Sequence, residues 1–410
     1  MAIKAVCRAL LRSPAGPLLL AAQVALSLMI FANVAYVVFV RFETTGRPTG
    51  IDLPNIFWLS TEGYRNDFNQ QNVTQPDLQY LNSLPGVISA SASNTVPQTF
   101  DALRSLVSAS PRLEGSKREA ILYLMTERAV DTLGLHLVQG RGFDKEAMPP
   151  LESSSQPQRP FGSEVIITAA LANKLFGGSR DALGKPLYFS MLDGGFATVV
   201  GVVAVMQAGA YFAPGADFIN EVALVPAAPA GRGTKYLVRT IPGARDQVMT
   251  RVRREFEPLQ PLRYIDRMED LATTAATMRK ADRHGAIVLA VLSSFVLAVS
   301  MLGLFGFASF AVTSRTKEIG TRRAIGATRS DIVKHFLFDN WLIATVGIAM
   351  GSVITLAFAL QLSMLLELPR LPLAFLVGSM ILIWIAGLLA ALLPALRGAR
   401  VPPAVATRSA

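Results

Sequence analysis

Side chains that commonly carry catalysis or bind metal ions are few in this sequence. The three histidines lie in separate segments, at His136, His284 and His335. The sequence holds no HExxH pattern, no nucleophile elbow and no clustered set of carboxylates. Asp266, Glu269 and Asp270 lie close together, but charged stretches of this kind usually form a solvated helix face. We therefore predict no catalytic centre, no metal site and no cofactor bound by this chain.

The pair Gly184-Lys185 raises the question of a nucleotide site. A phosphate-binding loop needs two glycines separated by four residues, then Lys and Ser or Thr, so that backbone N–H groups and a hydroxyl hold phosphates and magnesium. Here Pro186 follows the lysine, and the upstream Gly178 is out of register. We exclude a nucleotide site in this segment.

Charged side chains that can form ionic contacts are concentrated between residues 314 and 340. This stretch lies between two long apolar runs and carries six Lys or Arg residues against three acids. Short loops rich in Lys and Arg between membrane spans stay on the cytoplasmic side. The stretch therefore predicts a cytoplasmic loop with a basic surface.

Turn and capping signals divide this loop into two helices. Gly326 is placed to end the first, because glycine accepts the left-handed conformation on which helices finish. Thr328 and Asp331 have the spacing of a capping box that starts the second. Apolar residues from Ile332 to Leu337 then recur at helical spacing. We predict a short helix, a tight turn and an amphipathic helix that runs into the next membrane span.

The composition indicates a few membrane spans and a sizeable soluble domain. The chain has 410 residues, of which 51% are hydrophobic, and its mean hydropathy is +0.40. Much of the excess in the net charge of +10 lies beside apolar runs, where membrane topology and anionic lipid headgroups account for it, so we predict no nucleic-acid partner. Cys7 is the single cysteine, which excludes an intrachain disulfide.

The predicted fold is an α-helical membrane protein with four transmembrane helices and a large mixed α/β extracytoplasmic domain inserted between helices 1 and 2. Apolar runs near the span length of about 20 residues set the boundaries, and the flanking charges place both termini in the cytoplasm. The predicted parts are an N-terminal interfacial segment (1–15), transmembrane helix 1 (16–40), an extracytoplasmic domain of two subdomains (41–264), a stalk helix (265–284), transmembrane helix 2 (285–313), a cytoplasmic coupling segment (314–339), transmembrane helix 3 (340–363), an external turn (364–372), transmembrane helix 4 (373–395) and a cytoplasmic tail (396–410).

Short patterned segments predict the elements of the extracytoplasmic domain. Runs of Val and Ile, or alternation, predict strands at 55–60, 87–91, 121–125, 164–167, 198–205, 222–225 and 236–239. Helices are predicted at 75–83, 169–176 and 244–257, with Thr74 and Asp77 as a capping box for the first. Residues 151–160 are predicted to be a polar, mobile loop. Glycines that fit sharp turns between elements are Gly86, Gly140, Gly177 and Gly184.

Small residues in the predicted spans mark places where helices can approach closely. They are Gly303, Gly306, Gly347 and Gly351, and the last two form a Gly-x-x-x-Gly motif. Packing within the subunit and contact with a second copy fit this motif equally. The spans hold essentially no charged side chains, which ion-coupled carriers need near mid-membrane. We therefore predict that the driving energy comes from elsewhere.

One run in the basic stretch is specific beyond its charge. It consists of Arg315, Glu318, Ile319, Gly320, Arg322, Arg323, Ala324, Ile325, Gly326 and Ala327. This run closely resembles the signature of the MacB/FtsX-like ABC transporter permease family. Further motifs resemble that family in the same order, at 84–87, 140–143, 171–177, 183–185, 200–203 and 394–408. The chain departs from the family at Asp339-Asn340, where a Glu commonly begins the third span.

The resemblance implies a non-catalytic permease subunit in the bacterial cytoplasmic (inner) membrane. A separate ABC ATPase chain would bind ATP and magnesium, and its motion would drive the extracytoplasmic domain to export a peptide, lipoprotein, antibiotic or toxin. Further implied partners are a second permease, identical or homologous, a periplasmic adaptor and membrane lipid. The residues implied in ATPase coupling are Arg315, Glu318, Ile319, Gly320, Arg322, Arg323, Gly326 and Ala327.

Two other functions stay open at this point. FtsX-like members of the family use the same motion to switch on a cell-wall hydrolase, although their external domains are usually smaller. A membrane-anchored ligand sensor is the alternative from another class. A sensor would need a recognisable cytoplasmic output domain, and the sequence offers only short loops on that side.

Overall fold

The computed structural model describes residues 15–65, 68–99, 101–111, 117–144, 163–190, 195–209, 217–227, 232–366 and 371–400. These residues form two compact units, Met1–Glu43 with Arg283–Ala410, and Thr44–Asp282. The interfacial segment predicted at 1–15, apart from its last residue, lies outside the described residues, as do the predicted loop at 151–160 and the tail beyond residue 400.

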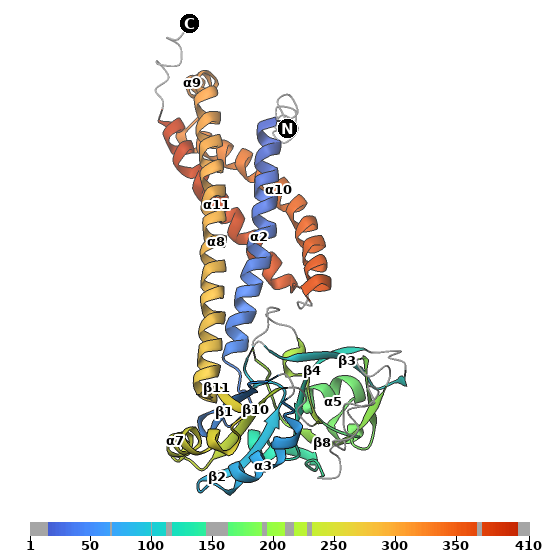
Figure 1. Ribbon diagram of the computed structural model, residues 1–410. Helices are drawn as coiled ribbons and strands as arrows, with labels where there is room; N and C mark the ends of the chain where they lie inside the picture. The colour runs from blue at the N-terminus through green and yellow to red at the C-terminus, as the bar shows by residue number, and fades with distance from the viewer. Residues whose placement is uncertain are drawn as a thin grey trace. The chain divides into compact units, whose positions relative to one another are not determined.

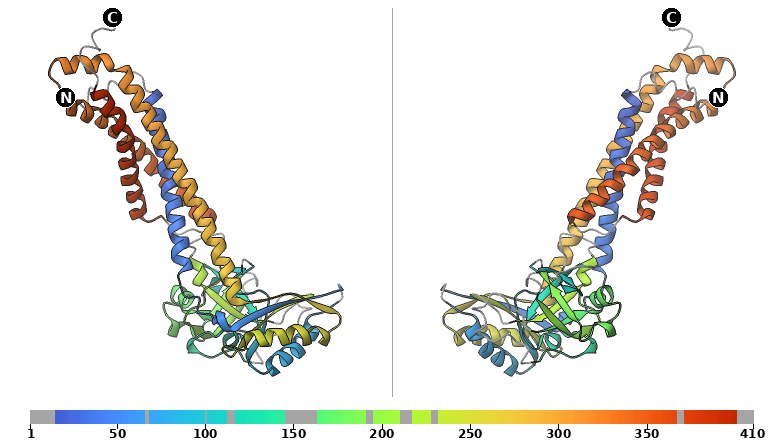
Figure 2. Two further views of the ribbon diagram at one scale, coloured as in Figure 1. Left: turned by 90° about the vertical axis from the view of Figure 1, so that its left-hand side faces the viewer. Right: turned by 90° about the vertical axis from the view of Figure 1, so that its right-hand side faces the viewer.

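The first unit is built from long helices (Figures 1 and 2). They are α2 (Ala15–Thr45), α8 (Leu271–Ser314, whose first residues belong to the second unit), α9 (Thr316–Ala324), α10 (Arg329–Leu366) and α11 (Leu373–Ala399). Their shared core includes Leu28 of α2, Leu304 of α8, Ile343 of α10 and Ile383 of α11. The helices thus bury one stripe each against their neighbours.

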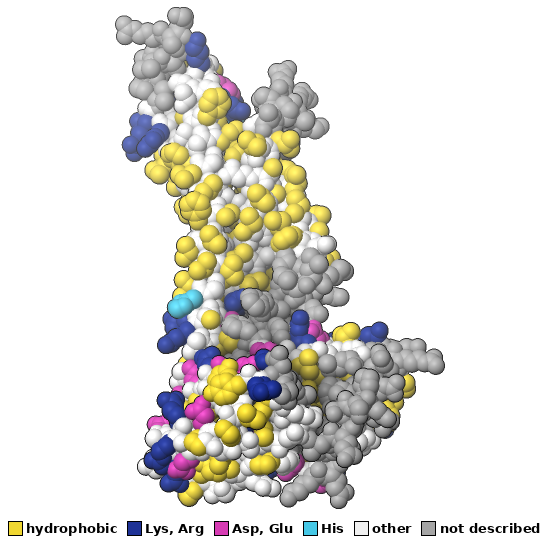
Figure 3. Space-filling view, viewed as in Figure 1, with side chains coloured by type: hydrophobic (Ala, Val, Ile, Leu, Met, Phe, Trp, Pro, Cys, Tyr) yellow, Lys and Arg dark blue, Asp and Glu magenta, His cyan; other side chains and the backbone are white. Residues whose placement is uncertain are grey.

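Four helices among the described residues are long and apolar enough to cross a membrane. These are Gly16–Glu43, Leu271–Ser314, Arg329–Gln361 and Leu373–Ala399. Large apolar side chains remain exposed along them, as the space-filling view shows (Figure 3), and Leu302 and Phe310 are 68% and 70% exposed. Such a surface suits lipid tails as a solvent, because apolar area in water would be unfavourable.

A four-stranded antiparallel sheet forms the first part of the second unit. Its strands, in spatial order, are β11 (Arg263–Asp270), β1 (Ile56–Gly63), β10 (Gly233–Thr240) and β2 (Val87–Ser93). Helices α3 (Gln71–Ser83) and α7 (Arg245–Glu255) bury apolar side chains against the same face, together with Phe57 and Phe256. β11 ends the strand order, so it is an edge strand.

Six further strands close into a ring. In order they are β4 (Arg118–Met125), β3 (Leu103–Ser108), β7 (Pro186–Phe189), β8 (Phe196–Val203), β6 (Glu164–Thr168) and β9 (Val222–Pro226), and β9 pairs again with β4 in parallel. β5 (Leu137–Gly140) pairs with β8 outside the ring. The ring core holds Leu122, Val165 and Leu171. The remaining short helices are α4 (Ala129–Leu133), α5 (Ala169–Phe176), α6 (Ser179–Ala182), η1 (Leu53–Asn55), η6 (Asp217–Asn220) and η7 (Glu257–Leu259).

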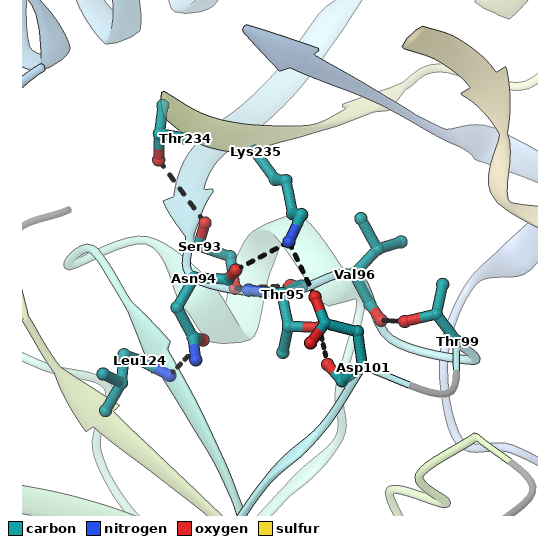
Figure 4. A network of polar contacts seen from close by, with 9 residues as sticks. All are labelled: Ser93, Asn94, Thr95, Val96, Thr99, Asp101, Leu124, Thr234 and Lys235. Carbon is teal, nitrogen blue, oxygen red and sulfur yellow. Dashed lines mark hydrogen bonds and ion pairs between the residues drawn. The ribbon is translucent and has the colours of Figure 1, made fainter. Parts of the chain in front are cut away.

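The sheet and the ring are joined where β2 meets β4. The strand pairing there consists of Ser93 opposite Met125. Figure 4 shows the polar contacts at this junction: Lys235 Nζ donates to the Asn94 carbonyl over 3.0 Å and to Asp101 Oδ2 over 2.9 Å. The Leu124 N–H donates to Asn94 Oδ1 over 3.0 Å. Residues from β10, the end of β2 and β4 therefore hold the junction.

Each strand predicted from the sequence overlaps a strand of the structure, and the helix predicted at 169–176 coincides with α5. The four turn glycines, at 86, 140, 177 and 184, all have positive φ as predicted. Strands β3, β5, β7 and β11 were not predicted. Three of these, β3, β5 and β7, have six residues or fewer, so their alternation gives a weak signal.

The prediction of a stalk helix from residue 265 is wrong in its first turns. Residues 263–270 form β11, and the helix begins at Leu271. β11 pairs with β1 from Phe57 to Gly63, and these backbone hydrogen bonds override the helix propensity of the stretch. From Leu271 the helix runs unbroken to Ser314, as the prediction of one long helix required.

Two further local predictions are corrected. Helix α3 begins at Gln71, and Thr74 does not cap it, because its Oγ1 donates to the Gln70 carbonyl while Asp77 is buried in an ion pair. Transmembrane helix 4 was predicted at 373–395, but the helix α11 continues past Pro394 to Ala399. Proline removes one backbone N–H, and the packing of Ala395 and Ala399 against other helices keeps the last turn helical.

Candidate functional site

The candidate site is α9 with the turn that follows it. α9 starts after Arg315, one residue beyond the end of α8. Its last turn closes with Gly326 at φ +108°, in the region that favours glycine. The predicted capping box at the start of α10 is present: Thr328 N–H donates to Asp331 Oδ2 over 3.0 Å, and Asp331 N–H donates to Thr328 Oγ1 over 3.2 Å. The turn between the helices is thus fixed at both ends.

The inner face of α9 packs against three other helices. Ile319 is 3% exposed, and Gly320 is buried beside it. Ile319 shares a core with Val312 of α8, Phe336 of α10 and Ala395 of α11. Ala327, in the turn, packs against the same core. Three of the eight predicted coupling residues, Ile319, Gly320 and Ala327, therefore face the protein.

An ion pair also ties the start of α9 to α10. Arg315 Nη1 lies 3.1 Å from Asp339 Oδ2, and the two side chains are 39% and 17% exposed. Asp339 Oδ1 is buried and has no hydrogen-bond partner among the described residues. Arg315 is one of the residues implied in ATPase coupling, and its guanidinium is directed to this carboxylate.

The outer face of α9 carries charge and one apolar side chain. Arg322 Nη2 donates to Glu318 Oε1 over 2.5 Å, one helical turn away, and both residues are exposed. Arg323 is half-buried, and Lys317 adds a further exposed cation. Ile325 is 82% exposed, the largest fraction among the large hydrophobic side chains of the described residues. The predicted residues that remain on this face are Glu318, Arg322, Arg323 and Gly326.

Sequence reasoning missed two residues of this site. Ile325 was part of the motif but was not predicted as a contact, and its position directly before a left-handed glycine was the available signal. Asp339 was noted as a departure from the family pattern, without an assigned partner. Its pairing with Arg315 depends on how α9 folds back on α10, which spacing alone does not give.

The predicted packing glycines fall into two groups. A Cβ added to Gly347 would lie 2.7 Å from the Ala21 carbonyl oxygen, and one added to Gly351 would lie 2.8 Å from Ala25 Cα, so both glycines contact α2. Gly303 faces the Gln23 side chain of the same helix. Gly306 has open space within 4 Å of an added Cβ, so no described residue packs on it.

The second unit has an open cleft lined by described residues. Its volume is about 500 Å³, and it lies between α3, the start of α4 and the segment after β5. Leu78, Val130 and Phe143 supply apolar lining, and Gln75 and Glu127 are among the polar residues. Arg128 lines it too, but its guanidinium donates to Asn82 Oδ1 and to the Ile88 carbonyl.

Two protein-family models match this chain, and together they include residues of both units. Residues 20–255 match the family described as MacB-like periplasmic core domain, which is more than half of the chain. The chain belongs to the MacB-like permease family. Residues 290–403 also match the FtsX-like permease C-terminal family, and these residues include α9 and the turn at Gly326. The resemblance carried by the basic run is thereby confirmed.

The curated relatives carry export names. The macrolide export ATP-binding/permease protein MacB of Wolinella succinogenes is 30% identical over 271 residues, which cover 62% of this chain and 40% of that protein. MacB of Agrobacterium fabrum is 27% identical over 289 residues, covering 66% and 40%. The chain therefore spans about two fifths of the length of these relatives.

Two solved structures are among those that match this chain. The periplasmic region of MacB from Actinobacillus actinomycetemcomitans has a TM-score of 0.34 at 14% identity, covering 56% of this chain and 94% of that one. The extracellular domain of the transporter YknZ has a TM-score of 0.31 at 16% identity, covering 51% and 100%.

Proposed function

We propose that this chain is the membrane subunit of a MacB-like ABC exporter. The family membership and the four apolar helices support a permease. In this proposal the first unit crosses the bacterial inner membrane with both termini in the cytoplasm, and the second unit lies outside it. An ABC ATPase supplies the energy, with ATP and magnesium bound on that partner, and two permease chains act together.

The observation that carries the proposal is the outer face of α9. The exposed Ile325, on the face of α9 that also carries Arg322 and Lys317, suits a docking site, because an apolar anchor within a charged rim is the usual anatomy of a specific interface. The excess of positive charge fits an acidic partner surface. We assign this face to the ATPase, since α9 lies in the basic stretch that membrane topology keeps in the cytoplasm.

Motion at α9 would then reach the extracytoplasmic unit through α8. The core around Ile319 joins α9 to α8, α10 and α11. α8 is a single helix of 44 residues that continues from Ser314 back to Leu271, next to β11 in the sequence. Export of a peptide, lipoprotein, antibiotic or toxin is the proposed output, and a periplasmic adaptor is a further proposed partner.

The test compares ATP turnover by the ATPase encoded beside this chain, alone and with the full chain in lipid nanodiscs. We expect the wild-type chain to bind the ATPase and change its turnover. Ile325→Asp should weaken binding at least about tenfold, because a charge replaces the buried anchor. Arg322→Glu, which reverses the rim charge, should weaken it as well.

The matched control is Ile325→Leu, which keeps an apolar side chain of the same size and should bind normally. If Ile325→Asp couples as well as the wild type, the assigned contact face is wrong. If no neighbouring ATPase binds the wild-type chain, the proposed function itself is wrong.

A further inference from the structure

The Arg315–Asp339 ion pair joins two helices, unlike the ion pair on the outer face of α9. Arg315 lies at the N-terminal end of α9, and Asp339 lies about ten residues into α10. Their 3.1 Å contact therefore spans the fold between two helices. By contrast, the exposed pair of Glu318 and Arg322 lies within α9 and ties no second helix.

Asp339 belongs to a polar junction that is enclosed by apolar packing. The next residue, Asn340, is 4% exposed, and its Nδ2 donates to the Gly387 carbonyl of α11 over 3.0 Å. Asp339 Oδ1 and Asn340 Oδ1 are both buried without a partner among the described residues. The junction thus connects α9, α10 and α11, and two of its buried acceptor oxygens accept no hydrogen bond from the described residues.

Spare acceptors matter because a guanidinium can engage both oxygens of a carboxylate. Arg315 now uses one oxygen of Asp339, while a bidentate pair is the stronger geometry. A small displacement of α9 can therefore tighten this contact without breaking it. Phe336, one helical turn before Asn340, contributes with Ile319 to the core that would move together with the junction.

We propose that Arg315 and Asp339 form a latch that transmits displacement of α9 to α10 and α11, and that neither is a contact with the ATPase. This inference rests on the proposed function for its output, but the latch itself is a property of this chain alone. Arg315 and Asp339 are positioning residues: they hold α9 at a fixed angle while the outer face meets the partner.

The experiment separates affinity from coupling, using the full chain in nanodiscs with the neighbouring ATPase. In Asp339→Asn, affinity for the ATPase should stay within about twofold of wild type, while the change in turnover should fall about fivefold, as expected for a partly buried ion pair. Arg315→Gln should behave alike. Asp339→Glu keeps the charge and should restore coupling, and Lys334→Gln, on the exposed side of α10, is the charge-change control.

Two results of the turnover and affinity measurements would overturn the latch. One is a loss of affinity in Asp339→Asn as large as in Ile325→Asp, which would make the pair part of the contact surface. The other is unchanged coupling. If the wild type binds no ATPase, the proposed function fails, and hydrogen exchange of the α9 amides decides instead. Exchange should then be about fivefold faster in Asp339→Asn and normal in Asp339→Glu, and equal rates in all variants would overturn the latch.

Discussion

Asp77 and Arg263 are the most deeply buried ion pair of the described structure, with side chains 2% and 1% exposed. Arg263 Nη2 donates to Asp77 Oδ1 over 2.7 Å, and the guanidinium lies 4.3 Å from the centre of the Phe256 ring. Burial, and next the Asp77 carboxylate, raise the pKa of Tyr236 well above its ordinary value, so its hydroxyl stays protonated and donates to Asp77. The cluster joins α3, β10 and β11.

We predict that Asp77→Asn destabilises the second unit strongly. The change leaves the Arg263 charge buried without a counter-ion, which costs about 3–5 kcal/mol. The double variant Asp77→Leu with Arg263→Met removes both charges and should lose much less. Thermal unfolding of the full chain in detergent measures both, with the exposed-site variant Asp266→Asn as control. Equal midpoints for Asp77→Asn and that control would contradict the prediction.

This cluster also shows the limit of residue patterns. Thr74 and Asp77 have the spacing of a capping box, and the sequence contains no sign that Asp77 has a partner 186 positions away. Thr328 and Asp331 have the same spacing, and there the box forms. The first pair lies in a buried helix, where tertiary contacts decide, whereas the second is exposed and local contacts decide.

At the scale of elements, helices α10 and α2 of the first unit approach closely at glycines. Gly347 and Gly351 lie one turn apart on α10 and meet α2 at Ala21 and Ala25. The Gly-x-x-x-Gly motif predicted a close approach, because small residues let backbones come together in lipid. The motif could not name the partner, which depends on the order in which helices pack.

We predict that Gly351→Ala destabilises the helical unit by about 1–3 kcal/mol, since the new methyl group would lie 2.8 Å from Ala25 Cα and must displace backbone. Gly306→Ala adds a methyl group to open space and should be neutral or slightly stabilising. Thermal midpoints of the two variants in detergent test this. A midpoint for Gly351→Ala at or above that of Gly306→Ala would refute the close contact.

The strands of the second unit were predicted where they are rich in Val and Ile or alternate, and missed where they are short and mixed in composition or highly charged. β8 and β10 are rich in Val, Leu or Thr, while β11 carries five charged residues in eight positions. A charged stretch of this kind predicts an exposed helix, whereas pairing with β1 holds these residues extended in the structure. Closure of the ring was beyond prediction as well, because the parallel pairing of β4 with β9 joins strands about a hundred residues apart.

At the scale of the molecule, the second unit has two parts, the sheet and the ring. Each strand of the ring pairs with a neighbouring ring strand on both sides. The backbone pairing between the ring and the sheet is one residue pair, and the contacts of Lys235 and Asn94 support it. Ile56 and Leu237 of the sheet also share a buried core with Ile121, Ile166 and Leu224 of the ring, so we expect the two parts to move together.

The proposed topology makes a direct prediction for the two units. In a Cys7→Ser background, a cysteine at Thr250 should react with a membrane-impermeant maleimide in cells whose outer membrane is permeabilised. A cysteine at Thr321 should react only after the inner membrane is opened, because the proposed topology places α9 and its basic residues in the cytoplasm. Both positions are exposed, so access to reagent is comparable. Labelling of both in unopened cells would reject the topology.

The edge position of β11 has a consequence for how these domains coexist in a crowded compartment. A strand with one free side offers its backbone N–H and C=O groups to any extended chain nearby, and such edges seed aggregation. Asp266 and Arg267 are exposed at the middle of β11, so an incoming strand would have to strip water from both charges. The charges that made this strand look like an exposed helix in the sequence thus protect the domain against edge-to-edge aggregation.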